Sequence, residues 1–369
     1  MRGRTDLQGA IFYSINVEQL VPAEHPLRGI RRLADEELKR LSPKFEAAYS
    51  KVGRPSIPPE QLIKASLLQA LYSIRSERQL CEQLGYNLLF RWFVGLNPEE
   101  GVWDPTTFTQ NRARFEEHGL YRAFFEGTVA AAIEKEAASV DHFSVDGTLI
   151  RAWASMKSVR PKGEPKDPSS GDSNRWVDWK GEKRSNETHE SKTDPEARLA
   201  RKGSGQETTL SHSLHVLMEN RHGLLVNLAV EEANGTVERT AAVAMLKEVR
   251  ARHWVRPSTL GADKGYDDGK FLREVEEDLG IEPHVPTRAG RIKGGDAEGW
   301  ARLRARSREK SARHRKSQVL RRRIEEIFGW VKEVAMLRRT RFVGRWKTRL
   351  YAYAAGASYN LMRLSRVTA

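Results

Sequence analysis

The sequence contains a single cysteine, Cys81, among its 369 residues. An intramolecular disulfide is therefore impossible, and a zinc site built from several cysteines is excluded. No apolar run approaches the roughly 20 residues that a helix needs to cross a bilayer. Residues 1–12 (MRGRTDLQGAIF) also lack the apolar core of a signal peptide. These absences predict a soluble protein of the reducing cytoplasm.

Positive charge is unevenly distributed along the chain. The formal net charge is +14, with 39% hydrophobic and 30% charged residues, which is typical of a globular protein of two or three domains. Residues 286–349 hold 21 Lys and Arg against 6 Asp and Glu, and the remainder of the chain holds 42 against 43. A basic run is often only a solvated surface. A surplus confined to one segment nevertheless favours a polyanionic partner, most simply nucleic acid.

Residues 1–137 are predicted to be helical. Prolines in IPPEQL suit the first turn of a helix, and apolar residues then recur at helical spacing. The predicted helices cover 57–74, 76–84, 87–95 and 106–117. Arg75, Arg78 and Arg91 on these short helices fit a helix-turn-helix-like DNA-binding unit. A helical packing or dimerisation module explains the same pattern equally well, so both interpretations stay open.

Residues 138–369 alternate strands with helices. HFSVDGTLIRAW alternates apolar and polar positions and predicts a strand that carries Asp146 at a glycine-containing break. A polar insertion is expected at about 155–209. Further strands are predicted at 210–220, 223–232, 258–263 and 281–286, and helices at 236–251 (with Thr236 as N-cap), 270–279, 318–333 and 346–364. This order predicts an α/β ribonuclease-H-like core, a mixed sheet flanked by helices, in which the first and fourth strands are neighbours.

The predicted helix at 318–333 carries an apolar stripe and a charged row. Arg321, Glu325 and Lys332 fall within roughly 40° of one another at about 100° per residue. One interpretation is an amphipathic surface helix with ion pairs one turn apart. The other is that Glu325 joins Asp146 and Asp263, which neighbouring strands bring to one sheet edge, in binding metal. Three carboxylates without cysteine ligands favour Mg²⁺ or Mn²⁺, and two such ions can cut and join phosphodiesters.

Other polar and aromatic residues carry weaker signals. His212 and His215 point to opposite faces of a strand, so they are not expected to bind one ion together. Trp330 is expected at the edge of the core, while stacking on an unpaired base stays open for Trp300 and Trp346. Turn roles are expected for three residues after the fourth strand, namely Lys264, Asp267 and Asp268.

Several long stretches carry a resemblance to a known family. The chain resembles the DDE transposases of bacterial insertion sequences, in the group named after insertion sequence five. The resemblance spans nearly the whole length, including GRPSIPPEQL, YSIRSERQL and YNLLFRWFVGL within 53–96, SVDGTLIRAWASMKS (144–158), TDPEARLARKGSG (193–205), GADKGYDD (261–268) and RRRIEEIFGWVK (321–332).

This resemblance implies specific site residues. The metal-binding and catalytic triad would be Asp146, Asp263 and Glu325. The family pattern of Tyr, Arg, Glu and Lys falls on Gln318, Arg321, Glu325 and Lys332, so the tyrosine is replaced. Glu326 is the rival third ligand, but it lies about 100° further round the helix. Other cations expected on DNA phosphates, beside Arg321 and Lys332, are Arg322, Arg338, Arg339 and Arg341.

The resemblance also implies an activity. The enzyme would cut double-stranded DNA at the ends of its element and join the freed 3′-hydroxyls to target DNA, using two Mg²⁺ or Mn²⁺ ions. Because two ends must be held together, a homodimer or larger synaptic assembly is expected, acting at the bacterial nucleoid without a membrane. The alternatives are a ribonuclease-H-like nuclease without strand transfer and an inactive DNA-binding transposase remnant.

Overall fold

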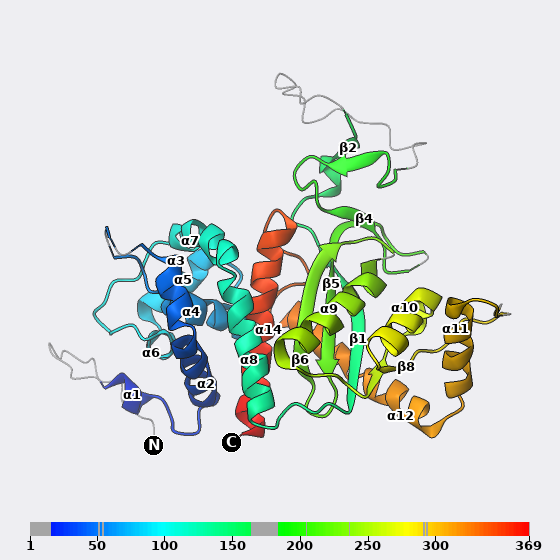
Figure 1. The fold of residues 1–369 in the computed structure, drawn as a ribbon. Coiled ribbons are helices and arrows are strands. Elements are labelled where there is room, and N and C mark those ends of the chain that lie inside the picture. The colour runs from blue at the N-terminus through cyan, green and yellow to red at the C-terminus, as the bar shows by residue number, and fades with distance from the viewer. Residues whose placement is uncertain are drawn as a thin grey trace, which may run out of the picture.

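The N-terminal part of the chain is helical, as predicted (Figure 1). The computed structural model describes residues 16–368, except Lys51, Arg54, residues 164–183, Ser204, Thr236, Arg291 and Lys293. The predicted N-cap Thr236 thus lies outside the described residues. The helices are α1 (Val17–Leu20), α2 (Pro26–Arg40), α3 (Ser42–Ala48), α4 (Pro59–Leu71), α5 (Glu77–Tyr86), α6 (Leu88–Val94), α7 (Thr106–Glu117) and α8 (Leu120–Glu134). The four helices predicted here correspond to α4, α5, α6 and α7.

Capping residues set where these short helices begin and end. The Ser76 hydroxyl accepts a hydrogen bond from the Gln79 N–H at 3.1 Å, and the Asn87 side chain accepts one from the Phe90 N–H at 3.2 Å. Each bond satisfies a backbone donor that has no partner inside the helix. Gly95 ends α6 with a φ of 89°, which a side chain would disfavour.

A mixed sheet forms the second part of the molecule. Its order is β6–β5–β1–β7–β8, and β4 pairs with the start of β5. β1 runs antiparallel to β5 and parallel to β7, so the predicted pairing of the first and fourth strands is confirmed. Together with the flanking helices, this confirms the ribonuclease-H-like fold class. The strands are β1 (His142–Arg151), β4 (Arg198–Ala200), β5 (Thr209–Glu219), β6 (Leu224–Glu232), β7 (Thr259–Gly261) and β8 (Glu282–His284).

Two details of the predicted strands differ in the structure. β1 does not break at Gly147 but continues to Arg151, because β5 pairs with it from Phe143 to Arg151. Gly147 is required for a different reason: a Cβ there would lie 2.9 Å from Nδ1 of His215. β7 is shorter than predicted and ends at Gly261, so Asp263 follows the strand. The Asp263 side chain caps a 3-10 helix at Lys264–Tyr266 by accepting a hydrogen bond from the Gly265 N–H at 2.7 Å.

Helices pack on both sides of the sheet. α9 (Val237–His253) contacts β1, β5 and β6, whereas α12 (Ala312–Arg321) contacts β1, β7 and β8. The predicted helix at 270–279 is α10 (Gly269–Arg273) followed by a π-helical turn at Glu274–Asp278. The remaining helices are α11 (Ala297–Arg308), α13 (Ile324–Glu333) and α14 (Arg345–Val367). The helix α11 and the first part of α12 were not predicted.

The predicted single helix at 318–333 is wrong, because the chain turns between α12 and α13. In a continuous helix the Leu320 carbonyl would accept a hydrogen bond from the Ile324 N–H. Here it accepts one from the Arg323 N–H at 3.0 Å and another from the Asn220 side chain at 3.0 Å. Arg323 in turn donates to the Asn220 carbonyl at 2.6 Å. A tertiary contact with the end of β5 thus replaces helical hydrogen bonds at this point.

Part of the predicted polar insertion is ordered β structure. β2 (Val159–Pro161) and β3 (His189–Ser191) pair antiparallel and project from the end of the sheet (Figure 1). Residues 164–183 of the insertion lie outside the described residues.

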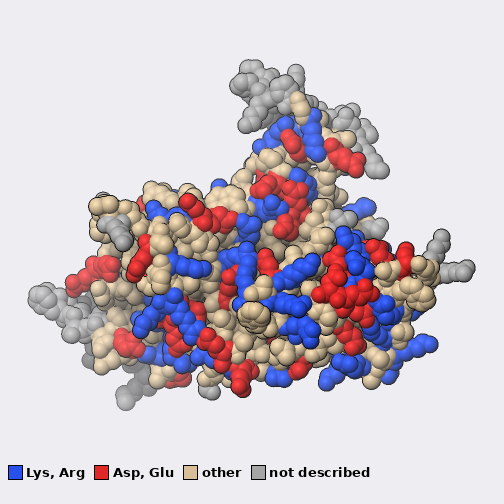
Figure 2. Space-filling view, viewed as in Figure 1, with Lys and Arg blue, Asp and Glu red and all other residues tan. Residues whose placement is uncertain are grey.

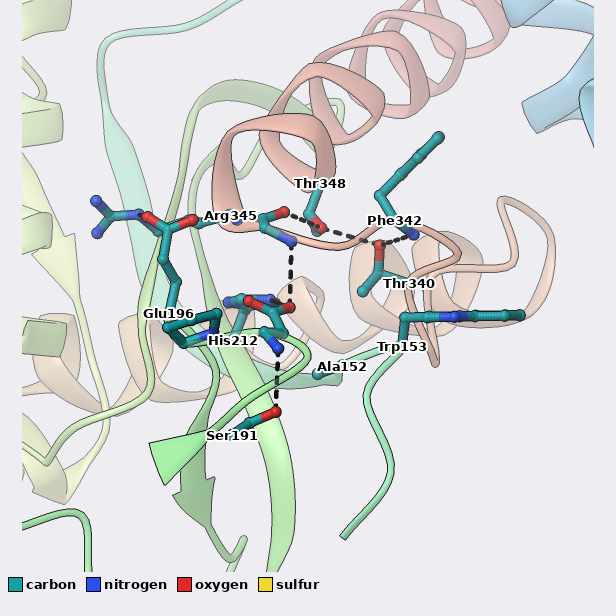
Figure 3. A network of polar contacts seen from close by, with 12 residues as sticks. Ala152, Trp153, Ser191, Glu196, His212, Thr340, Phe342, Arg345 and Thr348 are labelled. Atoms are coloured by element: carbon teal, nitrogen blue, oxygen red, sulfur yellow. Dashed lines mark hydrogen bonds and ion pairs between the residues drawn. The ribbon is translucent and has the colours of Figure 1, made fainter. Parts of the chain in front are cut away.

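A buried polar network holds the insertion against the start of α14. Asp194 and His212 are both fully buried and bonded at 3.2 Å, and the Gly344 N–H also donates to Asp194 at 3.2 Å. Glu196 accepts a hydrogen bond from the Arg345 N–H at 2.8 Å, and the hydroxyls of Thr340 and Thr348 lie 2.9 Å apart (Figure 3). Three distant stretches of sequence meet in this network.

α14 joins the helical part of the chain to the sheet. It lies between them and contacts α2, α4, α8 and β6 (Figure 1). Buried apolar residues from both parts form one continuous cluster. Among the described residues, no helix is long and apolar enough to cross a membrane.

Gly356 allows this close packing, and its replacement is expected to destabilise the protein. A Cβ at this position would lie 2.9 Å from side-chain carbons of Leu225 and Leu228 and 3.1 Å from Phe125. Gly356→Val should therefore lower the free energy of unfolding by about 1–3 kcal/mol through overpacking. Chemical denaturation measures the change, with Gly329→Ala as a control because a Cβ at Gly329 has no neighbour within 4 Å. Equal stability of Gly356→Val and the wild type would contradict the packing described here.

Candidate active site

A pocket opens beside β1 at the point where β7 ends. Pairing between β1 and β7 covers only His142 to Ser144, so the following stretch of β1 lies free of β7. The pocket is lined by Asp146 from β1, by Asp263 after β7 and by Glu325 from α13. Three carboxylates that are far apart in sequence therefore line one pocket.

The Asp146 carboxyl has a raised pKa. Burial raises the pKa of its carboxyl to about 6, and the nearby Asp263 and Glu325 carboxylates add to the rise. The Gly147 N–H, which donates to Asp146 at 2.8 Å, and the Arg321 guanidinium at 3.5 Å act in the opposite direction. Negative charge at this position is therefore only partly compensated by the protein.

This raised pKa predicts a pH-dependent difference in stability. Folded Asp146 keeps a proton that the unfolded chain has released, so the folded state loses stability as pH rises from 3.8 to about 6. The stability of Asp146→Asn does not fall in this way, because asparagine has no carboxyl group to titrate. Without divalent ions, its stability advantage over the wild type should grow across that range to about 1–3 kcal/mol. Urea unfolding of both proteins at several pH values measures it; a difference that does not vary with pH would contradict the prediction.

Glu325 and Glu326 face different surroundings. Glu325 is exposed within the pocket, and its side chain has no hydrogen bond or ion pair with any described residue. Glu326 instead forms an ion pair with Arg363 at 2.9 Å. Glu325 thus lines the pocket and Glu326 is not among its lining residues, and the helix that carries both begins later than predicted.

Two cations of the predicted pattern lie beside the carboxylates. Arg321, the last residue of α12, contacts Asp146, while Lys332 on α13 donates a hydrogen bond to the Thr148 hydroxyl. Burial lowers the pKa of Lys332, and nearby cations lower it further, although Glu325 opposes this. Gln318, in place of the family tyrosine, donates to the carbonyls of Ala262 at 3.3 Å and His284 at 2.7 Å. Its amide thus joins α12 to the residues just after β7 and at the end of β8.

The sequence did not point to a fourth carboxylate at this pocket, Glu238 in the first turn of α9. Burial raises the pKa of Glu238, and Asp263 raises it further, while Arg239 acts against the rise. A Cβ added at Gly147 would point to the face of β1 opposite to the Asp146 side chain, because successive residues of a strand alternate between faces. The Oε1 atom of Glu238 lies 3.4 Å from that Cβ position. Glu238 reaches the pocket from the other side of the sheet, so its spacing from the other carboxylates in the sequence does not indicate that they lie close together.

The carboxylates suit a hard cation in type, but they are not preassembled around one. Among the described residues, no group of three His, Cys, Asp or Glu side chains is close enough to hold a metal ion. The pocket nevertheless offers oxygen donors, as Mg²⁺ and Mn²⁺ prefer. The pKa values of Asp146 and Glu238 are raised mainly by burial, which a bound cation would counteract by stabilising the ionised carboxylates. The unbonded Glu325 side chain is exposed, so it is free to change rotamer within the pocket.

The other predicted DNA-contacting arginines lie in different surroundings. Arg322 is exposed, and Arg338 is exposed and paired with Glu333. Arg339 donates to the carbonyls of Ala152 and Trp153 and stacks on Trp153, whose side chain is 53% exposed.

Arg341, predicted to contact DNA, and Arg91, for which a DNA contact and a packing role were both open, are bonded to other parts of the protein. Arg341 donates to Gln69 at 2.6 Å and stacks on Tyr351, so it joins α4 to α14. Arg91 is 3% exposed and donates to the Leu84 carbonyl at 2.8 Å. Arg91 is therefore buried, whereas Arg341 is half-buried with its guanidinium bonded within the protein; Arg75 and Arg78 are exposed.

The weaker sequence signals resolve mostly into structural roles. His212 bonds Asp194, whereas His215 is buried beside Gly147, and neither of its ring nitrogens has a hydrogen-bond partner among the described residues. Asp267 pairs with Arg302 at 2.8 Å, and Asp268 caps α10. Trp330 and Trp346 pack against the core, whereas Trp300 is 55% exposed.

The fold and the pocket together define a class: ribonuclease-H-like proteins with an acidic pocket at the sheet edge. Comparison with family models is more specific. The model of the transposase DDE domain matches residues 169–361, more than half of the chain, and that of a transposase domain matches residues 15–114. The chain therefore belongs to the DDE transposase family, whose members are metal-dependent enzymes that act on DNA. Asp263 and Glu325 lie inside the matched region, and Asp146 precedes it.

Solved transposase structures resemble the chain only distantly. The piggyBac transposase in a synaptic complex with hairpin DNA is 9% identical, with 93% of this chain and 76% of that chain covered and a TM-score of 0.39. The Mos1 strand transfer complex is 14% identical, with 82% and 86% covered and a TM-score of 0.21. These values are too low to support conclusions about function. No functionally curated protein matches the sequence significantly.

Proposed function

We propose that this transposase cuts DNA at the ends of its own insertion sequence and joins the 3′-hydroxyl ends to target DNA. The observation that carries the proposal is the meeting of Asp146, Asp263 and Glu325 at one pocket beside Arg321 and Lys332. The assignment to the insertion-sequence-five group rests on the sequence resemblance alone and remains a prediction.

In this proposal the three carboxylates hold Mg²⁺ or Mn²⁺, with two ions expected. Such ions supply Lewis-acid stabilisation of phosphodiester oxygens and an activated hydroxyl nucleophile. The protein supplies position and charge. β1 and the cap after β7 fix Asp146 and Asp263 through backbone N–H donors, and α13 carries Glu325 to the open side. Arg321 and Lys332 lie where they can neutralise a phosphate and hold the strand in line.

The reaction requires partners and an organisation of the chain that we also propose. Double-stranded DNA is the substrate at both element ends and at the target, and joining two ends calls for a homodimer or larger synaptic assembly. Residues 1–137 would contribute to binding of the ends or to dimerisation, and residues 138–369 would form the catalytic domain. The continuous core around α14 supports rigid coupling between the two.

Strand transfer distinguishes the proposal from its two alternatives. The purified protein is incubated with labelled duplexes carrying the DNA that flanks its gene, a supercoiled target plasmid, and Mg²⁺ or Mn²⁺. Labelled ends joined to the plasmid through their 3′-hydroxyls support a transposase. Ion-dependent cuts without joining favour a nuclease on the same fold, and binding without cuts under any ion favours an inactive remnant.

A further inference from the structure

The basic segment at residues 286–349 divides into two groups of side chains. Arginines of α11 are bound to acidic or carbonyl groups of the protein itself. Arg304 contacts Glu276 at 2.9 Å and Glu277 at 2.7 Å, and Arg308 also pairs with Glu276. Arg302 and Arg306 likewise bond Asp267 and the carbonyls of Arg288 and Gly290. These contacts stabilise the packing of α11. They also reduce the positive potential that the α11 arginines present to an anionic partner.

The outer face of α12 is different. Arg315, Lys316 and Arg322 are exposed, and none has a side-chain hydrogen bond or ion pair with any described residue. Between them lies Val319, whose side chain is 64% exposed. Arg322 directly follows the last residue of α12 and keeps helical backbone angles. At about 100° per residue, Arg315, Val319 and Arg322 fall within roughly 60° of one another, and Lys316 lies about 60° further round from Val319. We call these four residues the α12 outer face.

The opposite face of α12 is fixed to the sheet close to the active site. Ser317 bonds His142 at 3.3 Å, and Gln318 bonds the Ala262 carbonyl, one residue before Asp263. Arg321 contacts Asp146, and the next residue, Arg322, belongs to the outer face. The unpaired cations are therefore carried by a helix whose inner side is held against the catalytic carboxylates.

Surface charge is consistent with this division. On the side shown in Figure 2, red and blue atoms intermingle over α10 and α11, while blue atoms gather at the lower right edge, where Figure 1 shows α12. Unpaired cations beside an acidic pocket are complementary to a phosphate backbone that must approach that pocket.

We infer that the α12 outer face is the surface that holds the backbone of duplex DNA as it enters the active site. Arg315, Lys316 and Arg322 contact phosphates, and Val319 packs against deoxyribose. The inference rests on the proposed function. It also assigns the α11 arginines to folding and not to DNA binding, although both helices are equally rich in basic residues.

The test compares two double variants that remove the same charge. Binding of the full-length protein to a fluorescent duplex is measured at several salt concentrations for the wild type, Arg315→Ala with Arg322→Ala, and Arg304→Ala with Arg308→Ala. The α12 variant should keep the wild-type melting temperature and bind DNA at least about 10-fold more weakly. Its salt slope, which is the slope of the logarithm of the binding constant against the logarithm of the salt concentration, should be smaller by about 1.8, roughly 0.9 for each lost phosphate contact. The α11 variant should keep the wild-type slope and melt at a lower temperature.

Specific outcomes would overturn the inference. If the α12 variant and the wild type have equal salt slopes, the α12 outer face does not contact DNA. If the α11 variant loses as much slope as the α12 variant, the α12 outer face has no special role in DNA binding. A change in self-association of the α12 variant, seen by sedimentation without altered DNA binding, would make the surface a contact between protein chains. Failure of the wild type to bind any duplex would instead count against the proposed function itself.

Discussion

Glu325→Gln is expected to abolish DNA cleavage, whereas Glu326→Gln is expected to leave it nearly unchanged. Glu325 lines the pocket close enough to raise the pKa of Asp146, and its side chain has no hydrogen bond or ion pair among the described residues. Glutamine keeps the shape of this side chain but removes the negative oxygen that a divalent cation requires. Loss of several kcal/mol of charge stabilisation corresponds to at least about 10³-fold in rate.

Glu326 provides the matched control, because it follows Glu325 directly on the same turn of α13. Its carboxylate pairs with Arg363 at 2.9 Å and is 55% exposed, so its removal should change stability by less than about 1 kcal/mol. Cleavage of end-labelled flanking DNA is compared for both variants, and DNA binding is measured in parallel to exclude misfolding. If the Glu325→Gln variant is fully active and the Glu326→Gln variant is inactive, the third metal-binding carboxylate is Glu326 and not Glu325.

Asp194→Ala is expected to destabilise the protein by about 3–5 kcal/mol, although it lies outside the pocket. Asp194 and His212 are fully buried, and Asp194 also accepts the Gly344 N–H at the start of α14. Burial alone would raise the pKa of Asp194, but the hydrogen bonds from His212 and Gly344 outweigh it and keep the pKa low. Alanine would leave buried donors without an acceptor, which is among the most costly changes in a folded protein.

An exposed ion pair is the control for this prediction. Glu207 lies 3.7 Å from Arg151 with its side chain 76% exposed, so Glu207→Ala should cost about 0–1 kcal/mol. Denaturant unfolding measures both variants, and limited proteolysis of Asp194→Ala should show faster cutting next to residues 189–197. Because the pKa of Asp194 is lowered in the folded state, its stabilising effect should fade as pH falls below 3.8. A cost below about 1 kcal/mol for Asp194→Ala would contradict the network in Figure 3.

Local patterns in the sequence predicted much of the fold. The strands around Asp146 and Asp263 and the helices α4 to α7 follow from hydrophobic periodicity and capping residues, which act within one element. The pairing of β1 with β7 follows from the order of these elements. The resemblance to a transposase family then indicated which carboxylates to examine.

The remaining features depend on contacts between distant residues. The break before Ile324 arises because Asn220, a hundred residues earlier, occupies the Leu320 carbonyl. The basic segment itself does not reveal which of its arginines form ion pairs within the protein. The positions of Glu276 and Glu277 decide this for α11. Glu238 approaches the pocket across Gly147 from the far side of the sheet. None of these relations has a spacing that the sequence displays.

Localised backbone cleavage by Fe²⁺ tests most directly whether the three carboxylates hold a divalent cation. Fe²⁺ can replace Mg²⁺ at an oxygen-donor site, and with ascorbate and peroxide it generates hydroxyl radicals that cut the nearby polypeptide. We predict cuts close to residues 146, 263 and 325 that excess Mg²⁺ suppresses and that Asp146→Asn eliminates. Cuts confined to other segments, or cuts at these three positions that persist in Asp146→Asn, would contradict the assignment of this pocket as the active site.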